Sequence, residues 1–402
     1  MKAVAELNSP QAQQPEIAPW PYFENDEIEA VARILRSGKV NYWTGDEGKA
    51  FEREYADYTG VRHAIALANG TVALELALYA LGIGSGDEVI TSSRTYISSA
   101  SCVVMRGAVP VVADVDPVSQ LITADTVHRV ITPRTKAIIP IHLAGWPCDM
   151  ASIMDLAREH NLKVIEDCAQ AHGAFYNGHP VGSFGDAAAF SFCQDKIITT
   201  GGEGGMLLLN DEQSWKKAWA YKDIGRSYDA VYSRQHPPGF RWLTESFGTN
   251  WRMTEMQAAI GRLQLRKLPS WVAKRRENAA ILTSCFSHLP GLRVTTPPSN
   301  VTHSYYKYYV FVETAALKPD WNRDRIMETI GMRGVPCMSG SCSEIYLEKA
   351  FLDQGFGPSE RLPVAKRLGE TSLMFLVHPT LDRSSMEMTC EVIKETMSKA
   401  TL

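Results

Sequence analysis

Short apolar runs alternate with segments of helical spacing through the first half of the chain. Between the strand-like runs lie four segments that combine this spacing with good helix formers: Thr71–Leu81, Ile97–Arg106, Met150–Asn161 and Glu212–Lys222. The runs themselves have the length and apolar content of buried strands: His63–Ala68, Glu88–Thr91, Val109–Val115, Ala137–His142, Lys163–Glu166, Ala187–Phe192 and Gly205–Leu209. This alternation predicts an α/β domain with a mostly parallel central sheet.

The pattern changes in the last third of the chain. Two helical segments, Thr254–Leu268 and Ser270–Leu289, are followed by prolines and then by the aromatic run Tyr305–Phe311, which is typical of a packed strand. Three further helices are predicted at Arg323–Gly331, Ser359–Gly369 and Ser385–Ala400. We therefore predict a large α/β domain over residues 20–269 and a smaller C-terminal α+β domain over residues 270–402.

Composition and charge exclude several classes of function. The 402 residues are 45% hydrophobic and 21% charged, as in an ordinary globular protein. The formal net charge is −4 and the basic residues are scattered, which argues against a nucleic-acid partner. No apolar run approaches the roughly 20 residues that a membrane span requires, and the polar stretch over residues 1–21 lacks an apolar signal core. We therefore expect a cytoplasmic protein without a membrane partner.

The cysteines indicate neither a metal site nor a disulfide framework. There are eight of them, without a Cys-x-x-Cys pair and without a neighbouring run of histidines. Reduced and mostly buried thiols are the preferred interpretation.

Lys196 is the most informative chemical feature. It is followed by the glycine-rich turn Gly201–Gly205, and Asp167 ends an earlier apolar run. A lysine that bonds pyridoxal 5′-phosphate (PLP) needs an acid to pair with the ring nitrogen of the cofactor and a cradle for its phosphate. A carboxylate buried at a strand end is costly unless a positive group pairs with it, and a protonated ring nitrogen is such a group. Alone, Lys196 would be interpreted as a solvated surface charge.

Other polar residues stand where such a cofactor would need them. Gly70 and Thr71 follow the first strand and open a helix, whose N-terminus favours an anion such as a phosphate. Ser191, five residues before Lys196, offers a hydroxyl to the same phosphate, and Gln170 offers a hydrogen bond to the ring hydroxyl. A simple strand-to-helix turn and a loop or cap glutamine remain the alternatives for these positions.

With these motifs the chain resembles the DegT/DnrJ/EryC1/StrS family of PLP-dependent sugar aminotransferases, which have the aspartate aminotransferase fold (fold type I). The resemblance runs from about Trp20 to the C-terminus. It is densest in Asn69–Ala73, Glu166–Gly173, Ser191–Gly205 and Phe247–Gly261. It implies PLP as the cofactor and the fold-type-I arrangement of a large domain and a smaller C-terminal domain.

The resemblance also implies roles for individual residues. Lys196 matches the Schiff-base lysine, Asp167 the acid facing the ring nitrogen and Gln170 a position beside the ring. Further matches are Gly70, Thr71 and Ser191 at phosphate-binding positions and Tyr96 at the aromatic that stacks on the ring. Asn250 resembles an asparagine that reaches the phosphate from the neighbouring subunit, which implies a homodimer with shared active sites. Some relatives have histidine in place of the lysine and act as dehydratases, so Lys196 supports amino transfer.

The implied substrates are glutamate and a nucleotide-linked 3-keto or 4-keto deoxysugar, in amino-sugar, surface polysaccharide or glycan biosynthesis. Arg252 is a candidate for the carboxylate of the amino donor, since its fork geometry suits carboxylates. Arg241 is a candidate for a diphosphate and His378 for the substrate. Each also has a structural alternative: Arg252 as an ordinary ion-paired arginine, and His378 as a satisfied structural histidine. For Arg241 the alternative is a proline-stiffened loop that packs Phe240 and Trp242 as an interface plug. A transaminase of a free cyclic ketone such as an inosose, and a regulatory PLP-binding protein without turnover, remain alternative functions.

Overall fold

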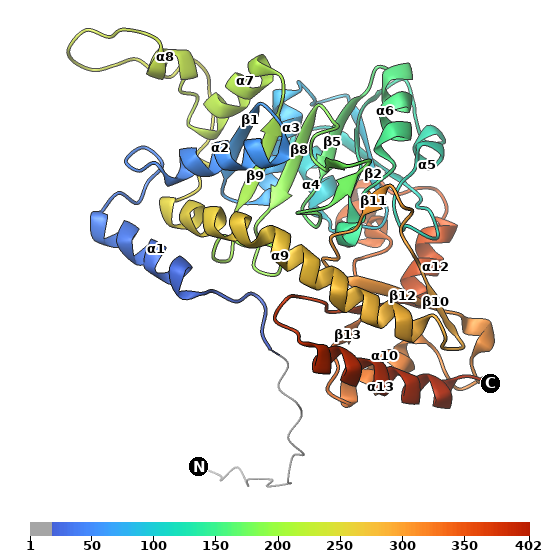
Figure 1. Ribbon diagram of the computed structural model, residues 1–402. Helices are drawn as coiled ribbons and strands as arrows, with labels where there is room; N and C mark the ends of the chain where they lie inside the picture. Colours follow the sequence, from blue (N-terminus) through green and yellow to red (C-terminus); the bar gives the residue numbers. More distant parts are fainter. Residues whose placement is uncertain (1–17) are drawn as a thin grey trace, which may run out of the picture.

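A seven-stranded sheet forms the centre of the larger part of the molecule (Figure 1). The computed structural model describes residues 18–402, so most of the polar N-terminal stretch considered above lies outside the described residues. The strand order is β1-β9-β8-β5-β4-β2-β3. These strands are β1 (His63–Leu67), β2 (Glu88–Ser92), β3 (Val109–Ala113), β4 (Thr135–Ile139), β5 (Lys163–Asp167), β8 (Ala187–Ser191) and β9 (Gly205–Leu209).

Only β9 runs against the direction of the other strands in this sheet of the described chain. It pairs antiparallel with both β1 and β8, whereas the pairings among β8, β5, β4, β2 and β3 are parallel. Each of the seven predicted runs overlaps one of these strands. The prediction of a mostly parallel sheet is therefore confirmed, and the carboxyl ends of its parallel strands meet at one edge.

Helices cover both faces of this sheet (Figure 1). The first eight are α1 (Asn25–Ser37), α2 (Glu47–Thr59), α3 (Gly70–Ala80), α4 (Ser98–Met105), α5 (Ala124–His128), α6 (Met150–Glu159), α7 (Glu212–Lys222) and α8 (Tyr228–Tyr232). Every residue of β2, β8 and β9 is buried, as expected for central strands with both faces covered. Within residues 18–402, no helix is both long enough and apolar enough to cross a membrane.

The long helix α9 (Glu255–Phe286) connects this sheet to the C-terminal part of the chain (Figure 1). The two helices predicted on either side of Pro269 are one continuous helix, so the prediction of a break was wrong. Proline disfavours a helix interior because it lacks the amide donor. Here packing outweighs that cost, since Leu265 and Leu268 contact the core beneath the large sheet and Leu282 contacts the C-terminal core. The predicted domain boundary at residue 269 falls inside this helix, and the division into two domains stays a prediction.

The C-terminal part is built on a four-stranded antiparallel sheet of order β10-β12-β14-β13. Its strands are β10 (Leu292–Val294), β12 (Tyr308–Val312), β13 (Cys337–Met338) and β14 (Ser372–Phe375), and its helices are α10 (Arg323–Met332), α11 (Lys349–Gln354), α12 (Pro363–Thr371) and α13 (Arg383–Ala400). A small sheet joins β11 (Val301–Thr302) to β6 (Phe175–Tyr176) and β7 (His179–Pro180). The strand expected from Tyr305 begins only at Tyr308, which leaves Tyr306 and Lys307 outside it.

We expect Phe286→Ala to lower the free energy of unfolding by about 3–5 kcal/mol, because it leaves a cavity in the C-terminal core. Phe286 is fully buried, and its ring lies 5.5 Å from that of Phe375 and 5.8 Å from that of Tyr308, centroid to centroid. Urea unfolding followed by circular dichroism measures the change. Leu352→Ala is the control: its side chain is 61% exposed, so we expect a loss below about 0.5 kcal/mol. Equal losses for the two variants would contradict this account of the core.

Candidate active site

A cavity of about 720 Å³ opens beyond the carboxyl ends of β5 and β8. In open α/β sheets this is where ligands collect. The cavity is lined by seven of the residues that the sequence singled out: Gly70, Thr71, Tyr96, Asp167, Gln170, Ser191 and Lys196. Residues more than 120 positions apart in the chain therefore share one site.

Lys196 lies on the wall of this cavity, in the loop after β8. Its Nζ donates to the Tyr306 hydroxyl at 3.4 Å and lies 3.7 Å from the Asp195 carboxylate. The Trp20 indole donates to the Lys196 carbonyl at 2.9 Å, which fixes the backbone of the lysine. The side chain is 16% exposed, so the amine is sheltered from bulk solvent and still reaches the cavity.

Asp167 ends β5 with its side chain buried at the base of the cavity. Its carboxylate accepts from the Ser99 hydroxyl at 2.9 Å and from the Ala169 amide at 3.1 Å. Burial raises the pKa of Asp167 above its usual value although both hydrogen bonds act in the opposite direction. A buried carboxylate in this state is stabilised by a cation. The protonated ring nitrogen of PLP is such a cation, so Asp167 fits the role of its acidic partner.

The turn between β1 and α3 forms a close-fitting cradle. The Asn69 side chain caps α3 by accepting from the Val72 amide at 3.0 Å. A β-carbon on Gly70 would lie 2.7 Å from the β-carbon of Ser191, so only glycine brings these two segments so close. The N-terminus of α3, Thr71 and the Ser191 hydroxyl thus border the same side of the cavity. Helix N-termini and hydroxyl groups bind phosphate.

Tyr96 and Gln170 line the same cavity as the cradle and Asp167. The Tyr96 side chain, between β2 and α4, is 69% exposed and lines the cavity, so its ring is accessible to a ligand. Gln170 accepts from the Ala144 amide at 2.7 Å through its side-chain oxygen. This leaves the NH₂ end of Gln170 as the group it can offer to a ligand.

Four predicted residues do not line this cavity within the described chain: Asn250, Arg252, Arg241 and His378. The Arg252 guanidinium forms an ion pair with the buried Asp223. Asn250, which forms a backbone bridge with Asp223, is exposed. In the described chain the Arg252 guanidinium is thus held outside the cavity, and its contact with the amino donor stays a prediction.

His378 is buried and does not line the cavity of the described chain. It stacks on Trp20 at 6.0 Å between ring centroids and its Nδ1 hydrogen-bonds with the Thr380 hydroxyl at 2.8 Å. Burial lowers the pKa of His378 to about 3, so the ring is neutral. These contacts fit the structural alternative for His378, and its contact with the substrate stays a prediction.

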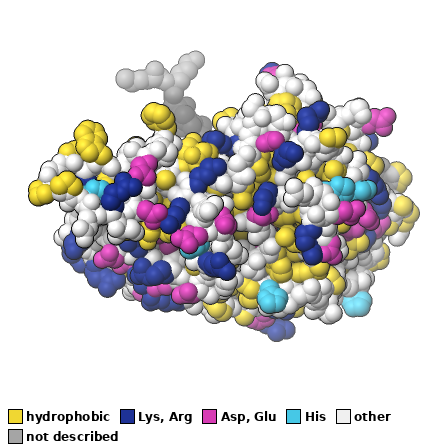
Figure 2. Space-filling model, turned by 90° about the horizontal axis from the view of Figure 1, so that it is seen from above, with side chains coloured by type: hydrophobic (Ala, Val, Ile, Leu, Met, Phe, Trp, Pro, Cys, Tyr) yellow, Lys and Arg dark blue, Asp and Glu magenta, His cyan; other side chains and the backbone are white. Residues whose placement is uncertain are grey.

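Arg241 lies in the loop that projects from the molecule after α8 (Figure 1). The neighbouring Phe240 and Trp242 are 79% and 81% exposed, and hydrophobic side chains gather at this end of the molecule, on the left in Figure 2. Both alternatives for this loop, a diphosphate contact through Arg241 and an interface plug of Phe240 and Trp242, therefore stay predictions.

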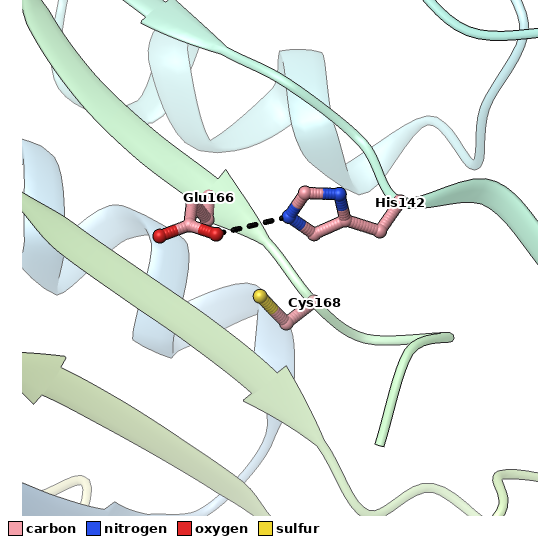
Figure 3. A group of neighbouring side chains, drawn as sticks. All are labelled: His142, Glu166 and Cys168. Atoms are coloured by element: carbon pink, nitrogen blue, oxygen red, sulfur yellow. Dashed lines mark hydrogen bonds and ion pairs between the residues drawn. The ribbon is translucent and has the colours of Figure 1, made fainter. Parts of the chain in front are cut away.

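A buried group of possible metal ligands lies beside β5 (Figure 3): His142, Glu166 and Cys168. The Cys148 amide donates to Nδ1 of His142, so Nε2 carries the proton and donates to Glu166 at 3.0 Å. The Glu166 carboxylate also accepts from three backbone amides, at positions 182, 184 and 185. His142 and Glu166 are thus occupied by hydrogen bonds that support the strand end carrying Asp167.

Sequence reasoning missed several residues of the site. Asp195 stands directly before Lys196, and Tyr306 and Lys307 belong to the aromatic run that we interpreted as a packed strand; all three line the cavity. Ser99 reaches Asp167 from α4. Proximity to Lys196 was a usable signal for Asp195, whereas Tyr306, Lys307 and Ser99 come from distant segments and carry no local motif.

Comparison with known proteins identifies the family. The model of the DegT/DnrJ/EryC1/StrS aminotransferase family matches residues 21–394. The chain belongs to this family. The aminotransferase of Psychrobacter cryohalolentis has a crystal structure that is 55% identical, with a TM-score of 0.94 over 95% of this chain and 99% of that one. The fold is therefore fold type I, as predicted.

Two curated relatives have named activities. GDP-perosamine synthase of Caulobacter vibrioides is 42% identical over 298 residues, which are 73% of this chain and 76% of the relative. dTDP-3-amino-3,4,6-trideoxy-alpha-D-glucose transaminase of Streptomyces venezuelae is 34% identical over 368 residues, which are 91% of this chain and 90% of the relative. The family member described here is a PLP-dependent aminotransferase, so the predicted enzyme class and cofactor are confirmed.

Proposed function

We propose that this aminotransferase moves an amino group from glutamate to a nucleotide-linked ketosugar, a 3-keto or 4-keto deoxysugar, in amino-sugar, polysaccharide or glycan biosynthesis. The arrangement of Lys196 and Asp167 in one cavity carries the proposal, because it combines an amine with an acid for the ring nitrogen. The named activities of the two curated relatives, on GDP-linked and dTDP-linked sugars, support the acceptor class.

The side chains would divide the work as follows. PLP supplies an electron sink at the carbon that loses or gains a proton. Asp167 would hold the ring nitrogen protonated, and the cradle of Gly70, Thr71 and Ser191 would fix the phosphate. Lys196 would bond the cofactor between turnovers. Its freed Nζ would carry the proton in both half-reactions, from the donor in the first and to the new amino sugar in the second.

Tyr306 and Asp195 would hold Lys196 in position for these transfers. Asp195 accepts a hydrogen bond from the Tyr306 hydroxyl and lies beside the Lys196 ammonium group. The nearby lysines and this hydrogen bond lower the pKa of Asp195 although burial raises it. Asp195 therefore stays ionised, and its negative charge stabilises a protonated Lys196.

We further propose a homodimer in which Asn250 of each subunit completes the site of the other. Asn250 is exposed and does not line the cavity of its own chain. The loop before it exposes Phe240, Trp242 and Phe247, the last at 99%. Clustered exposed aromatics are typical of surfaces that a partner covers.

A mixing experiment tests the shared site. We expect Lys196→Ala and Asn250→Ala to be each strongly impaired, and a mixture subjected to subunit exchange to regain about a quarter of wild-type activity, since random C₂ pairing gives half heterodimers with one intact site each. Subunit exchange is verified by native mass spectrometry. If Asn250 served its own subunit, no heterodimer would contain an intact site, so a verified exchange without regained activity would contradict the proposal.

The proposed substrates are tested by visible absorbance of the PLP-loaded enzyme. Glutamate is expected to remove the visible band of the bound cofactor, and one nucleotide ketosugar from a panel is expected to restore it. Restoration by a free inosose as readily as by any nucleotide-linked sugar would favour the cyclic-ketone alternative. A stable band that no amino donor changes would favour a PLP-binding protein without turnover.

A further inference from the structure

Lys307 is a second basic residue in the cavity that the roles above leave unused. Among the described residues that line the cavity, Lys196 and Lys307 are the only basic ones. Lys307 directly precedes β12, and its side chain is 16% exposed. Its Nζ lies 4.8 Å from the centre of the Tyr306 ring. A lysine so well sheltered from solvent needs an anionic partner.

The Asp195 carboxylate lies beside Lys307 but forms no hydrogen bond with it. Its Nζ lies 3.9 Å from the Asp195 carboxylate, which is too long for a hydrogen bond. That carboxylate also accepts from the Tyr306 hydroxyl and lies 3.7 Å from Nζ of Lys196. Within residues 18–402, Nζ of Lys307 therefore has no hydrogen-bond acceptor. Three N–H donors therefore remain for a ligand in the cavity.

Both lysine side chains lie against the ring of Tyr306. Nζ of Lys196 also lies 4.8 Å from the centre of the Tyr306 ring, so the two nitrogens are separated by no more than twice that distance. An amino donor that reacts beside Lys196 brings a carboxylate within this range. Arg252 of the same chain is unsuitable, because it is paired with Asp223 and does not line the cavity.

We infer that Lys307 binds a carboxylate of the amino donor. The inference rests on the proposed function, since it requires that an α-amino acid enters this cavity. The ammonium group would donate to the carboxylate, while Asp195 keeps its contact with Tyr306 and Lys196. Charge-assisted hydrogen bonds of this kind are about twice as strong as neutral ones.

The first test separates the two half-reactions in single-turnover experiments on the PLP-loaded enzyme. For Lys307→Met, we expect the glutamate concentration for half-maximal rate to rise about tenfold or more, because the variant loses a charge-assisted hydrogen bond to the donor carboxylate. The ketosugar concentration for half-maximal rate in the second half-reaction is the internal reference and should change much less. Lys307→Arg retains the positive charge and should recover most of the affinity for glutamate.

The second test measures binding without turnover. Glutarate, a dicarboxylate that lacks the reacting amine, is titrated into the enzyme by calorimetry between pH 6 and about 9.5. Burial lowers the pKa of Lys307 to about 8. The charged or titratable groups facing it are Asp195, Lys196, Arg275 and His378. A basic group with a lowered pKa is cationic below that value, so glutarate affinity should fall as the pH rises through about 8, and Lys307→Met should remove this fall.

The outcomes are distinguishable from failure of the proposed function. If the wild type transaminates and Lys307→Met needs the same glutamate concentration for half-maximal rate, the inference is overturned and the proposed function is left intact. A larger effect on the ketosugar than on glutamate would also overturn it, since Lys307 would then serve the acceptor. Failure of the wild type with every donor would overturn the proposed function. Glutarate binding with the same pH profile in wild type and Lys307→Met would again overturn the inference.

Discussion

Lys196→Ala is expected to lower turnover by at least about 10³-fold, because it removes the nucleophile that bonds the cofactor and the base that moves the proton. The amine lies between the Tyr306 hydroxyl and the Asp195 carboxylate. Among the described residues, Lys307 is the only other basic group on the cavity wall. The measurement is steady-state turnover with glutamate and the accepted ketosugar.

Two further readouts make this result specific. After borohydride reduction, mass spectrometry should find the cofactor covalently attached to the wild type and unattached in Lys196→Ala. Lys216→Ala is the matched control, since Lys216 lies at the surface and pairs with Glu212 and Asp229. We expect its activity within about twofold of the wild type, because exposed ion pairs contribute little. Normal turnover by Lys196→Ala would contradict the assigned role.

Periodicity was sufficient to predict the large sheet, because a helix separates each pair of successive strands from β1 to β5 and most residues of every strand are buried. The antiparallel direction of β9 was not predictable from its own residues, since a buried run has the same pattern in either direction. The continuity of α9 was missed for a similar reason. Pro269 is a local signal for a break, whereas the packing that overrides it comes from segments on both sides of the helix.

The site was predictable where its residues stand in motifs at strand ends. Gly70, Asp167 and Lys196 each follow or end a strand, and the parallel strands bring these ends together. Ser99 and Tyr306 were missed because their contacts depend on how α4 and the C-terminal part lie against the sheet. No local motif around His378 decides between substrate contact and a structural role, and its ring stacks on that of Trp20 in the described chain.

Asp167→Asn is expected to lower turnover by about 10²- to 10⁴-fold, because breaking a buried ion pair costs about 3–5 kcal/mol. The asparagine has nearly the same shape but no negative charge to keep the ring nitrogen protonated. We also expect weaker binding of PLP, measured by fluorescence titration of the apoenzyme. The variant should stay folded, as measured by circular dichroism. Burial of the charged Asp167 carboxylate is unfavourable in the apoprotein, as its raised pKa indicates, and the neutral asparagine avoids this cost.

Ser99→Ala separates the charge of Asp167 from its hydrogen bonding. It removes the hydroxyl that donates to the carboxylate at 2.9 Å and leaves the charge in place. A neutral donor to a charged acceptor contributes about 1.5 kcal/mol, so we expect about a tenfold loss of turnover, well below that of Asp167→Asn. If both variants lost activity equally, the position of the carboxylate and not its charge would limit the reaction. If Asp167→Asn kept full activity, another group would have to keep the ring nitrogen protonated, although Asp167 is the buried carboxylate at the base of the described cavity.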